Sequence, residues 1–199
     1  MKVLLTITTI LLFSQAFSQL AEVKFRELTF DNGMLYPAVV IPENKAYEDA
    51  INKDLMAGIA DLKESDFCIG QYGYVQKSTH LQIHIFCNCI DLDESENRFF
   101  LYNIENGTAV PYSDLLNPTK LGDAGSYLAD RTRTYLESLS SQISKTEENT
   151  IMETNFDAFK TEMTRDGVNL WLTDNAQWGK DPLFISWTDL RSFLRLHFI

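Results

Sequence analysis

The sequence is poor in basic residues and lacks the common signatures of catalysis. Its 199 residues include 17 Lys and Arg against 28 Asp and Glu, which gives a formal net charge of -11. An acidic chain without a Lys or Arg cluster repels phosphate, which argues against nucleic acid as a partner. The chain contains no Gly-x-Ser-x-Gly elbow, no phosphate-binding glycine loop and no zinc-protease motif. We therefore predict no catalytic residue, no metal ligand set and no cofactor.

The N-terminal residues have the pattern of a secretory signal peptide. Lys2 gives a positive start, residues 3–13 are an apolar run, and Ala16-Phe17-Ser18 is a small-x-small cleavage site. A helix that spans a membrane needs about 20 apolar residues, so this run is too short, and no later stretch is longer. We expect residues 1–18 to be removed. Residues 19–199 would then form a secreted or periplasmic domain with no transmembrane segment.

The remaining sequence alternates between strand and helix patterns, which predicts an α+β fold. Apolar residues three or four apart predict helices over residues 47–62 and 122–145, and a shorter helix is expected over residues 155–163. Because no Pro/Ser-rich linker or composition break occurs, we predict a single domain, a twisted and mainly antiparallel sheet with helices packed on one face. Strands are expected at residues 23–30, 35–41, 67–75, 80–90, 98–104, 168–173 and 183–187.

The chain has three cysteines, Cys68, Cys87 and Cys89, and an exported protein is where disulfides persist. Residues 67–75 and 80–90 read as a hairpin, and a turn centred between residues 77 and 78 places Cys68 opposite Cys87. This register predicts a Cys68–Cys87 bridge. If the strand register is shifted by two residues, the same side chains stay on the apolar face, and Cys89 is favoured as the partner of Cys68 instead. Three free thiols are the remaining alternative, and a metal site lacks a fourth ligand.

Other polar candidates are less specific. His80 and His84 lie four residues apart on one expected strand, on the face opposite the cysteines, which we expect to be solvated. Two acidic groups could be the acid and base of a glycan hydrolase, although runs of this kind are usually solvated loops. They consist of Glu147 and Glu148, and of Asp91, Asp93, Glu94 and Glu96.

Three tryptophans close together near the C-terminus are the candidate ligand-binding residues. Trp178 falls in the polar loop between the last two expected strands, where a core role is least expected. Indole rings stack on sugars or anchor protein interfaces. Trp171 and Trp187 are weaker candidates, because each lies on an expected strand and can serve the core or a half-buried sheet.

Several short segments resemble a known extracytoplasmic family. The resemblance spans residues 23–194 and is to the domain of unknown function found in RsiV-like anti-sigma factors and in the non-catalytic part of PdaC-like peptidoglycan deacetylases. It implies an α+β fold, export, and binding rather than catalysis, with lysozyme recognised by the anti-sigma members. The segments are Tyr36-Pro37, Ala50-Ile51-Asn52, residues 100–107, Tyr112-Ser113-Asp114-Leu115-Leu116 and residues 166–171.

The sequence thus predicts an exported, non-catalytic binding domain of the bacterial cell envelope. Its acidic charge favours a cationic envelope protein such as a lysozyme, because complementary fields speed association. Peptidoglycan, which is itself partly anionic, is the other candidate ligand and would be held by aromatic stacking. An envelope glycan hydrolase that uses an acidic pair is the alternative function.

Overall fold

A computed structural model of the chain describes residues 23–90, 96–138, 145–146, 149, 157, 159–171, 182–195 and 198. The expected signal peptide, residues 1–18, lies outside these residues. The helices are α2 (Lys45–Gly58), α3 (Leu121–Ser138) and the short α5 (Trp187–Leu190), with 3-10 helices η1 (Asp61–Glu64), η2 (Tyr112–Leu115) and η3 (Pro118–Lys120). The strands are β1 (Lys24–Thr29), β2 (Leu35–Val40), β3 (Cys68–Lys77), β4 (His80–Cys89), β5 (Glu96–Asn103), β6 (Thr108–Ala109), β7 (Lys160–Met163), β8 (Gly167–Trp171) and β9 (Leu183–Ser186).

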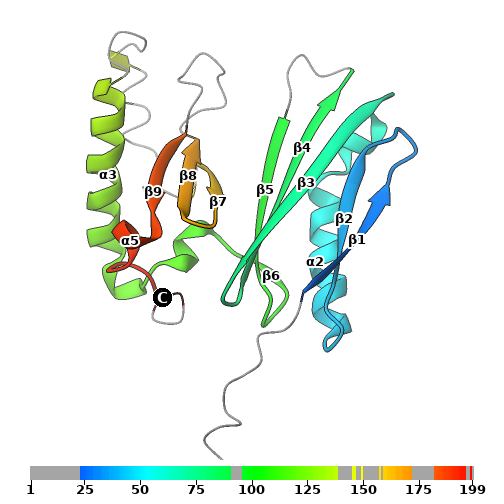
Figure 1. Cartoon of the computed structure of the whole chain (residues 1–199), viewed down its shortest axis with the longest axis horizontal. Helices are drawn as coiled ribbons and strands as arrows, with labels where there is room; N and C mark the ends of the chain where they lie inside the picture. The colour runs from blue at the N-terminus through cyan, green and yellow to red at the C-terminus, as the bar shows by residue number, and fades with distance from the viewer. Residues whose placement is uncertain are drawn as a thin grey trace, which may run out of the picture.

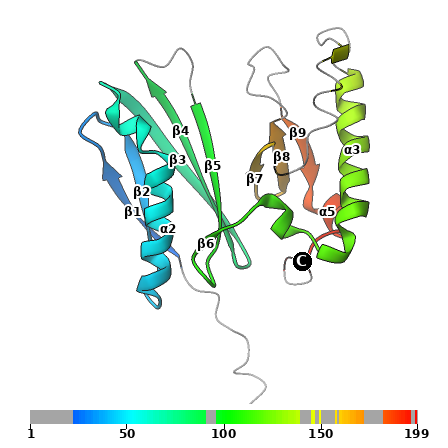
Figure 2. The same cartoon turned by 180° about the vertical axis from the view of Figure 1, so that it is seen from behind.

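These strands form three antiparallel sheets. They pair as β1-β2, as β3-β4-β5-β6 and as β7-β8-β9. The predicted α+β class and the antiparallel pairing are confirmed. The single sheet of the prediction is divided, with α2 beside the first two sheets and α3 beside the third (Figures 1 and 2).

The four-stranded sheet, called here the central sheet, separates two hydrophobic cores. Leu81, Ile83 and Ile85 of β4 point to one side, where they pack with α2 and with β2. The second core contains Leu101 of β5 and lies among β7, β8, β9 and α3. Successive strand residues point to opposite faces, so each strand of the central sheet supplies side chains to both sides.

Helix α2 is held against β2 by both apolar and polar contacts. Ile51 and Leu55 form its buried stripe, and the Asn44 side chain accepts a hydrogen bond from the Tyr47 N–H at the N-terminus. From the same helix, the Asn52 amide accepts from the Val39 N–H and donates to the Val39 carbonyl, each at 2.8 Å. The side-chain amide thereby bonds β2 as a neighbouring strand would.

The β3–β4 hairpin corrects the predicted disulfide. The structure joins Cys68 to Cys89, and Cys87 is a buried free thiol that pairs with Gly70 instead of Cys68. The turn lies one residue further along than predicted, with Lys77 opposite His80 and Ser78 at a φ of 52°. A one-residue shift of the turn moves every cross-strand pair by two. The apolar face is unchanged, so hydrophobic patterning alone could not choose between the registers.

Two further predictions are wrong. The helix expected over residues 155–163 is contradicted by strand β7, in which Thr161 and Met163 are buried and Lys160 and Glu162 are only partly buried. That alternation has the period of a strand. The face of β4 that carries His80 is solvated only toward its far end, at Phe86, because His80 itself is 1% exposed and lies against the second layer.

Candidate binding site on the central sheet

One end of the central sheet carries an exposed apolar surface. Phe67 lies opposite Ile90, whose N–H donates to the Phe67 carbonyl at 3.0 Å. Strand alternation places Ile69 and Phe86 on the same side as these two, away from the disulfide. We call these four residues the distal face. Their exposed fractions are 53% for Phe67, 58% for Ile69, 36% for Phe86 and 75% for Ile90.

The distal face is unusual within the described residues. It holds four of the seven large apolar side chains that are exposed there. Apolar patches with a polar rim mark interaction sites on soluble proteins. At this end of the fold, exposed Asp31, Glu64 and Asp66 outnumber the single exposed Lys63. Hydrogen bonds from Asn32 to the carbonyls of residues 62 and 65 tie these segments together.

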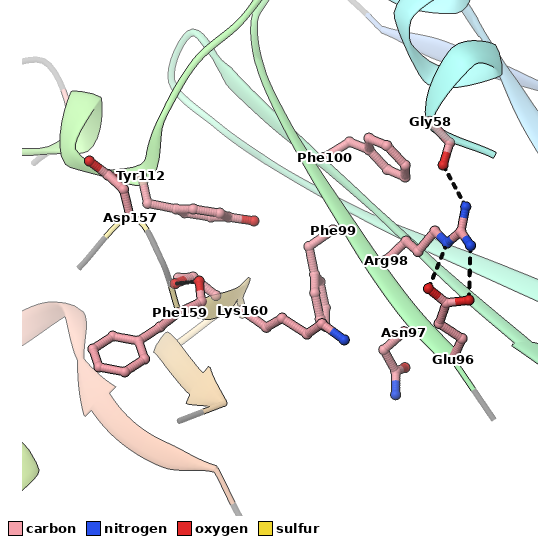
Figure 3. Close-up of a pocket in the computed structure, with 11 residues that line it drawn as sticks. Gly58, Glu96, Asn97, Arg98, Phe99, Phe100, Tyr112, Asp157, Phe159 and Lys160 are labelled. Atoms are coloured by element: carbon pink, nitrogen blue, oxygen red, sulfur yellow. Dashed lines mark hydrogen bonds and ion pairs between the residues drawn. The ribbon is translucent and has the colours of Figure 1, made fainter. Parts of the chain in front are cut away.

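A cleft of about 440 Å³ lies between β5 and β7 (Figure 3). We call it the β5 cleft. From the β7 side, Tyr112 and Lys160 reach toward Phe99 of β5. Asn97, also on β5, lies further along the cleft. Burial raises the pKa of the Tyr112 hydroxyl, so the phenol stays protonated at neutral pH. The cleft therefore offers aromatic rings with amide and ammonium groups beside them.

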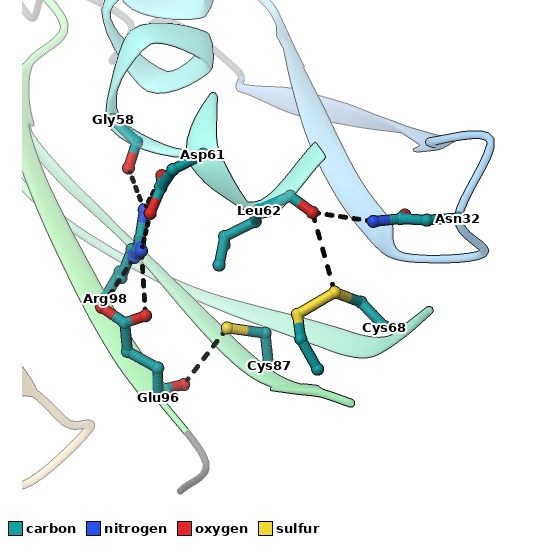
Figure 4. Close-up of polar contacts among 9 residues, drawn as sticks. Asn32, Gly58, Asp61, Leu62, Cys68, Cys87, Glu96 and Arg98 are labelled. Atoms are coloured by element: carbon teal, nitrogen blue, oxygen red, sulfur yellow. Dashed lines mark hydrogen bonds and ion pairs between the residues drawn. A yellow bond between two sulfur atoms is a disulfide. The ribbon is translucent and has the colours of Figure 1, made fainter. Parts of the chain in front are cut away.

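Arg98 fixes the other wall of the β5 cleft (Figure 4). Its guanidinium donates to both oxygens of Asp61 at 2.7 Å, to both oxygens of Glu96 at 3.0 and 2.9 Å, and to the Gly58 carbonyl at 2.7 Å. All five N–H groups of the guanidinium are thereby used. The hydrogen bonds from Arg98 hold the pKa of the Asp61 carboxyl below its usual 3.8. Together, Arg98, Asp61 and Glu96 carry one net negative charge.

The histidines of β4 have structural contacts. His84 stacks on Phe99 with ring centroids 4.4 Å apart, and its Nε2 lies 2.9 Å from the Asn97 side-chain oxygen. His80 Nε2 lies 3.0 Å from a carboxylate oxygen of Asp114, which also binds the Arg195 guanidinium. Among the described residues, no group of three or more His, Cys, Asp or Glu side chains could hold a metal ion.

The structure places two of the three predicted tryptophans, and it does not bring them together. Trp187 is half-buried in the second core, its Nε1 donates to the Thr164 carbonyl at 3.1 Å, and the Lys77 ammonium lies 4.5 Å from its ring. Trp171 pairs with Lys160 at the end of β8, and its buried Nε1 bonds no described residue. Trp178 lies outside the described residues.

Most predicted acidic candidates also lie outside the described residues: Asp91, Asp93, Glu94, Glu147 and Glu148. Glu96 is described, and both of its oxygens are bound by Arg98. Sequence reasoning missed the β5 cleft, whose walls come from residues 58, 96–100, 112, 157 and 159–161. The available signal was in β5, where neighbouring Phe99 and Phe100 give the strand an aromatic ring on each face.

The fold belongs to the class of α+β domains in which antiparallel sheets and helices pack into two cores about a central sheet. Within the described residues, no helix is long and apolar enough to cross a membrane. No family model and no curated protein matches the chain.

The solved structures that are similar to it include two DUF3298 family proteins. One, from Pseudomonas aeruginosa, has a TM-score of 0.54 and 9% identity over 90% of this chain and 96% of that chain. The other, from Bacteroides fragilis, has a TM-score of 0.38 and 10% identity over 88% and 94%. At this identity, the first structure supports the fold alone.

Proposed function

We propose that this chain is an exported, non-catalytic binding domain of the bacterial cell envelope and that its partner is a basic protein of the lysozyme-like class. The observation that carries the proposal is the distal face, an exposed apolar surface at an end of the fold where exposed acidic side chains outnumber basic ones. An apolar centre with a charged rim is how protein interfaces are built. The net charge of -11 would attract a basic partner over a longer range.

We propose an extracytoplasmic location for the protein. The Cys68–Cys89 bridge fits an oxidising compartment, where disulfides persist. The signal-peptide pattern of residues 1–18 and the resemblance to the RsiV-like and PdaC-like domain support the same location. In this proposal, residues 19–199 form the mature domain.

Peptidoglycan is the second candidate ligand, and the β5 cleft is the observation in its favour. Phe99, Tyr112 and Phe159 supply rings on which a sugar can stack, and Asn97 and Lys160 lie beside them. Trp178 is proposed as an additional contact, with Trp171 and Trp187 in supporting roles. The hydrolase alternative has less support, because the carboxylate of Glu96 already binds Arg98.

The proposal is tested by titrating residues 19–199 with lysozyme and, separately, with solubilised peptidoglycan by calorimetry. We expect lysozyme to bind and its affinity to fall about tenfold when salt shortens the Debye length from about 8 Å to about 3 Å. Glycan binding should hardly respond to salt and should fall in Trp178→Ala. Absence of lysozyme binding at low salt would rule out the proposed partner.

Substitutions then locate the contact. Ile90→Ser removes the most exposed apolar side chain of the distal face, and we expect about tenfold weaker binding from the lost apolar burial. Leu121→Ser is the matched control, because Leu121 is 44% exposed on α3, outside the distal face. Equal losses in both variants would contradict the assignment of the distal face.

A further inference from the structure

Two strands that end a sheet have their outer edges closed by side-chain amides. On β2, the Asn52 amide bonds both backbone groups of Val39. On β7, the Gln82 amide donates to the Thr161 carbonyl at 2.7 Å and accepts from the Met163 N–H at 2.6 Å. An open edge presents unpaired N–H and C=O groups that attract another strand, and these amides remove that opportunity.

The outer edge of β5 is covered by a short strand over only part of its length. Strand β6 pairs only with Tyr102 and Asn103, and the Leu101 and Asn103 carbonyls accept from the N–H groups of Val110 and Gly107 on that side. Strand alternation therefore turns the N–H and C=O groups of Phe99, two residues before Leu101, to the same side.

The same alternation applies to Asn97, one step further along β5. Within the described part of the chain, no residue hydrogen bonds to the backbone groups that Asn97 and Phe99 turn outward. Backbone groups of this kind require a partner, from protein or from water. Strand β6 therefore pairs with only one end of β5. The rest of the outer edge of β5 is long enough to pair with another short strand.

The β5 cleft runs along this open edge and has two unlike walls (Figure 3). On the α2 side, the lining includes Phe100 and the carboxylate of Glu96. Glu96 shares the Arg98 guanidinium with Asp61, and these three charged groups leave one net negative charge. On the β7 side are the aromatic rings of Phe99, Tyr112 and Phe159, with Asp157 and Lys160 beside them. A strand laid beside β5 would send alternate side chains to these two walls.

We propose that β5 pairs with an extended segment of the partner polypeptide, which continues the line of β6 and carries basic and apolar side chains in alternation. The basic side chains face Glu96, whose charge is reinforced by Asp61 on the same guanidinium, and the apolar ones face the rings of Phe99, Tyr112 and Phe159. This inference rests on the proposed function and adds the conformation and pattern of the segment that is bound. A glycan has no amide ladder at the spacing of the Asn97 and Phe99 groups.

The probe is an acetylated and amidated peptide of seven residues, Lys-Val-Lys-Val-Lys-Val-Lys, titrated into residues 19–199. Two further peptides carry N-methyl groups, one on every valine and one on every lysine. In a strand, alternate residues turn their N–H groups to opposite sides, so only one of the two sets can bond β5. We expect one methylated peptide to bind like the parent and the other to bind at least about tenfold more weakly, for the loss of two or more hydrogen bonds.

Amide hydrogen exchange provides a readout on the unmodified protein. The parent peptide should slow exchange at Asn97 and Phe99, whereas the Arg98 and Phe100 amides, which point to β4, should change little. Asn97→Pro removes an outward N–H and should weaken peptide binding about fivefold relative to Asn97→Ala, which loses the same side chain but keeps the donor.

Three results would overturn the inference: no binding of the parent peptide, equal binding of both methylated peptides, or unchanged exchange at Asn97 and Phe99. Loss of lysozyme binding in Ile90→Ser would not affect this test, since that residue lies outside the β5 cleft. If the protein binds lysozyme but not the peptide, the proposed function stands and the proposed strand pairing is wrong. If the protein binds the peptide but not lysozyme, the strand pairing stands and the proposed partner is wrong.

Discussion

Replacing Gln82 by leucine should weaken the contact between the two layers of the fold. The Gln82 side chain is 1% exposed and reaches from the central sheet to the edge of β7. Its amide group bonds the Thr161 carbonyl, the Met163 N–H and the Tyr112 hydroxyl. Leucine fills a similar volume and can make none of these bonds.

The expected loss follows from the three buried groups that the substitution leaves without Gln82. A buried polar group without a hydrogen bond costs about 1–3 kcal/mol, so the sum is about 3–9 kcal/mol. Relaxation around the site and the more favourable burial of leucine reduce this figure. We expect the free energy of unfolding to fall by about 3–5 kcal/mol, a large part of the roughly 5–15 kcal/mol that a domain possesses.

The assay is equilibrium urea unfolding of residues 19–199, followed by circular dichroism and by tryptophan fluorescence. Gln71→Leu is the matched control, because Gln71 lies on the same face of the central sheet and is exposed. The control should change the unfolding free energy by about 0.5 kcal/mol or less. A loss below about 1 kcal/mol in Gln82→Leu would refute the reasoning that this amide joins the layers.

Three further predictions concern the cysteines and the carboxylate at the cleft. Mass analysis without reductant should find Cys68 bonded to Cys89, and replacing both by alanine should lower stability by about 3 kcal/mol, since the bridge closes a loop of 21 residues' separation. The Cys87 thiol should resist alkylation until the chain unfolds, because it is buried and burial raises its pKa above 9.0; rapid labelling of native protein would contradict this. Because Arg98 lowers the pKa of Asp61, that pair stabilises the fold above about pH 4, and its contribution is lost as the pH falls through the lowered pKa. The stability difference between wild type and Asp61→Asn should therefore shrink steadily as the pH is lowered below about 4; a difference that does not depend on pH would contradict this.

The sequence predicted most of the strands and both long helices because each has a clear local period, whereas β7 was predicted as a helix. The face of β4 that carries Leu81, Ile83 and Ile85 was predicted correctly for the same reason, and this face is the side of the central sheet that meets α2. The pairing of Cys68 was wrong because it depends on which residue adopts the left-handed turn conformation. Here that residue is Ser78, and serine has no strong preference for it.

The candidate sites were beyond sequence reasoning for a different reason. Gln82 and Thr161 meet across 79 positions of sequence, and Arg98 and Asp61 across 37. No local pattern encodes such contacts. The distal face could not be predicted either. Strand alternation puts Phe86 and His80 on the same face of β4, but the second layer covers that face only near His80.

The division of the fold into two cores also has a consequence in time. The first core draws its buried residues from positions 30–104 and the second from positions 101–198. As the chain emerges from the ribosome or from a translocation channel, the first half can therefore complete its core and its Cys68–Cys89 bridge before β7 exists. During that interval, the whole second face of the central sheet stands open. We expect this half-finished chain to be the species most in need of a chaperone.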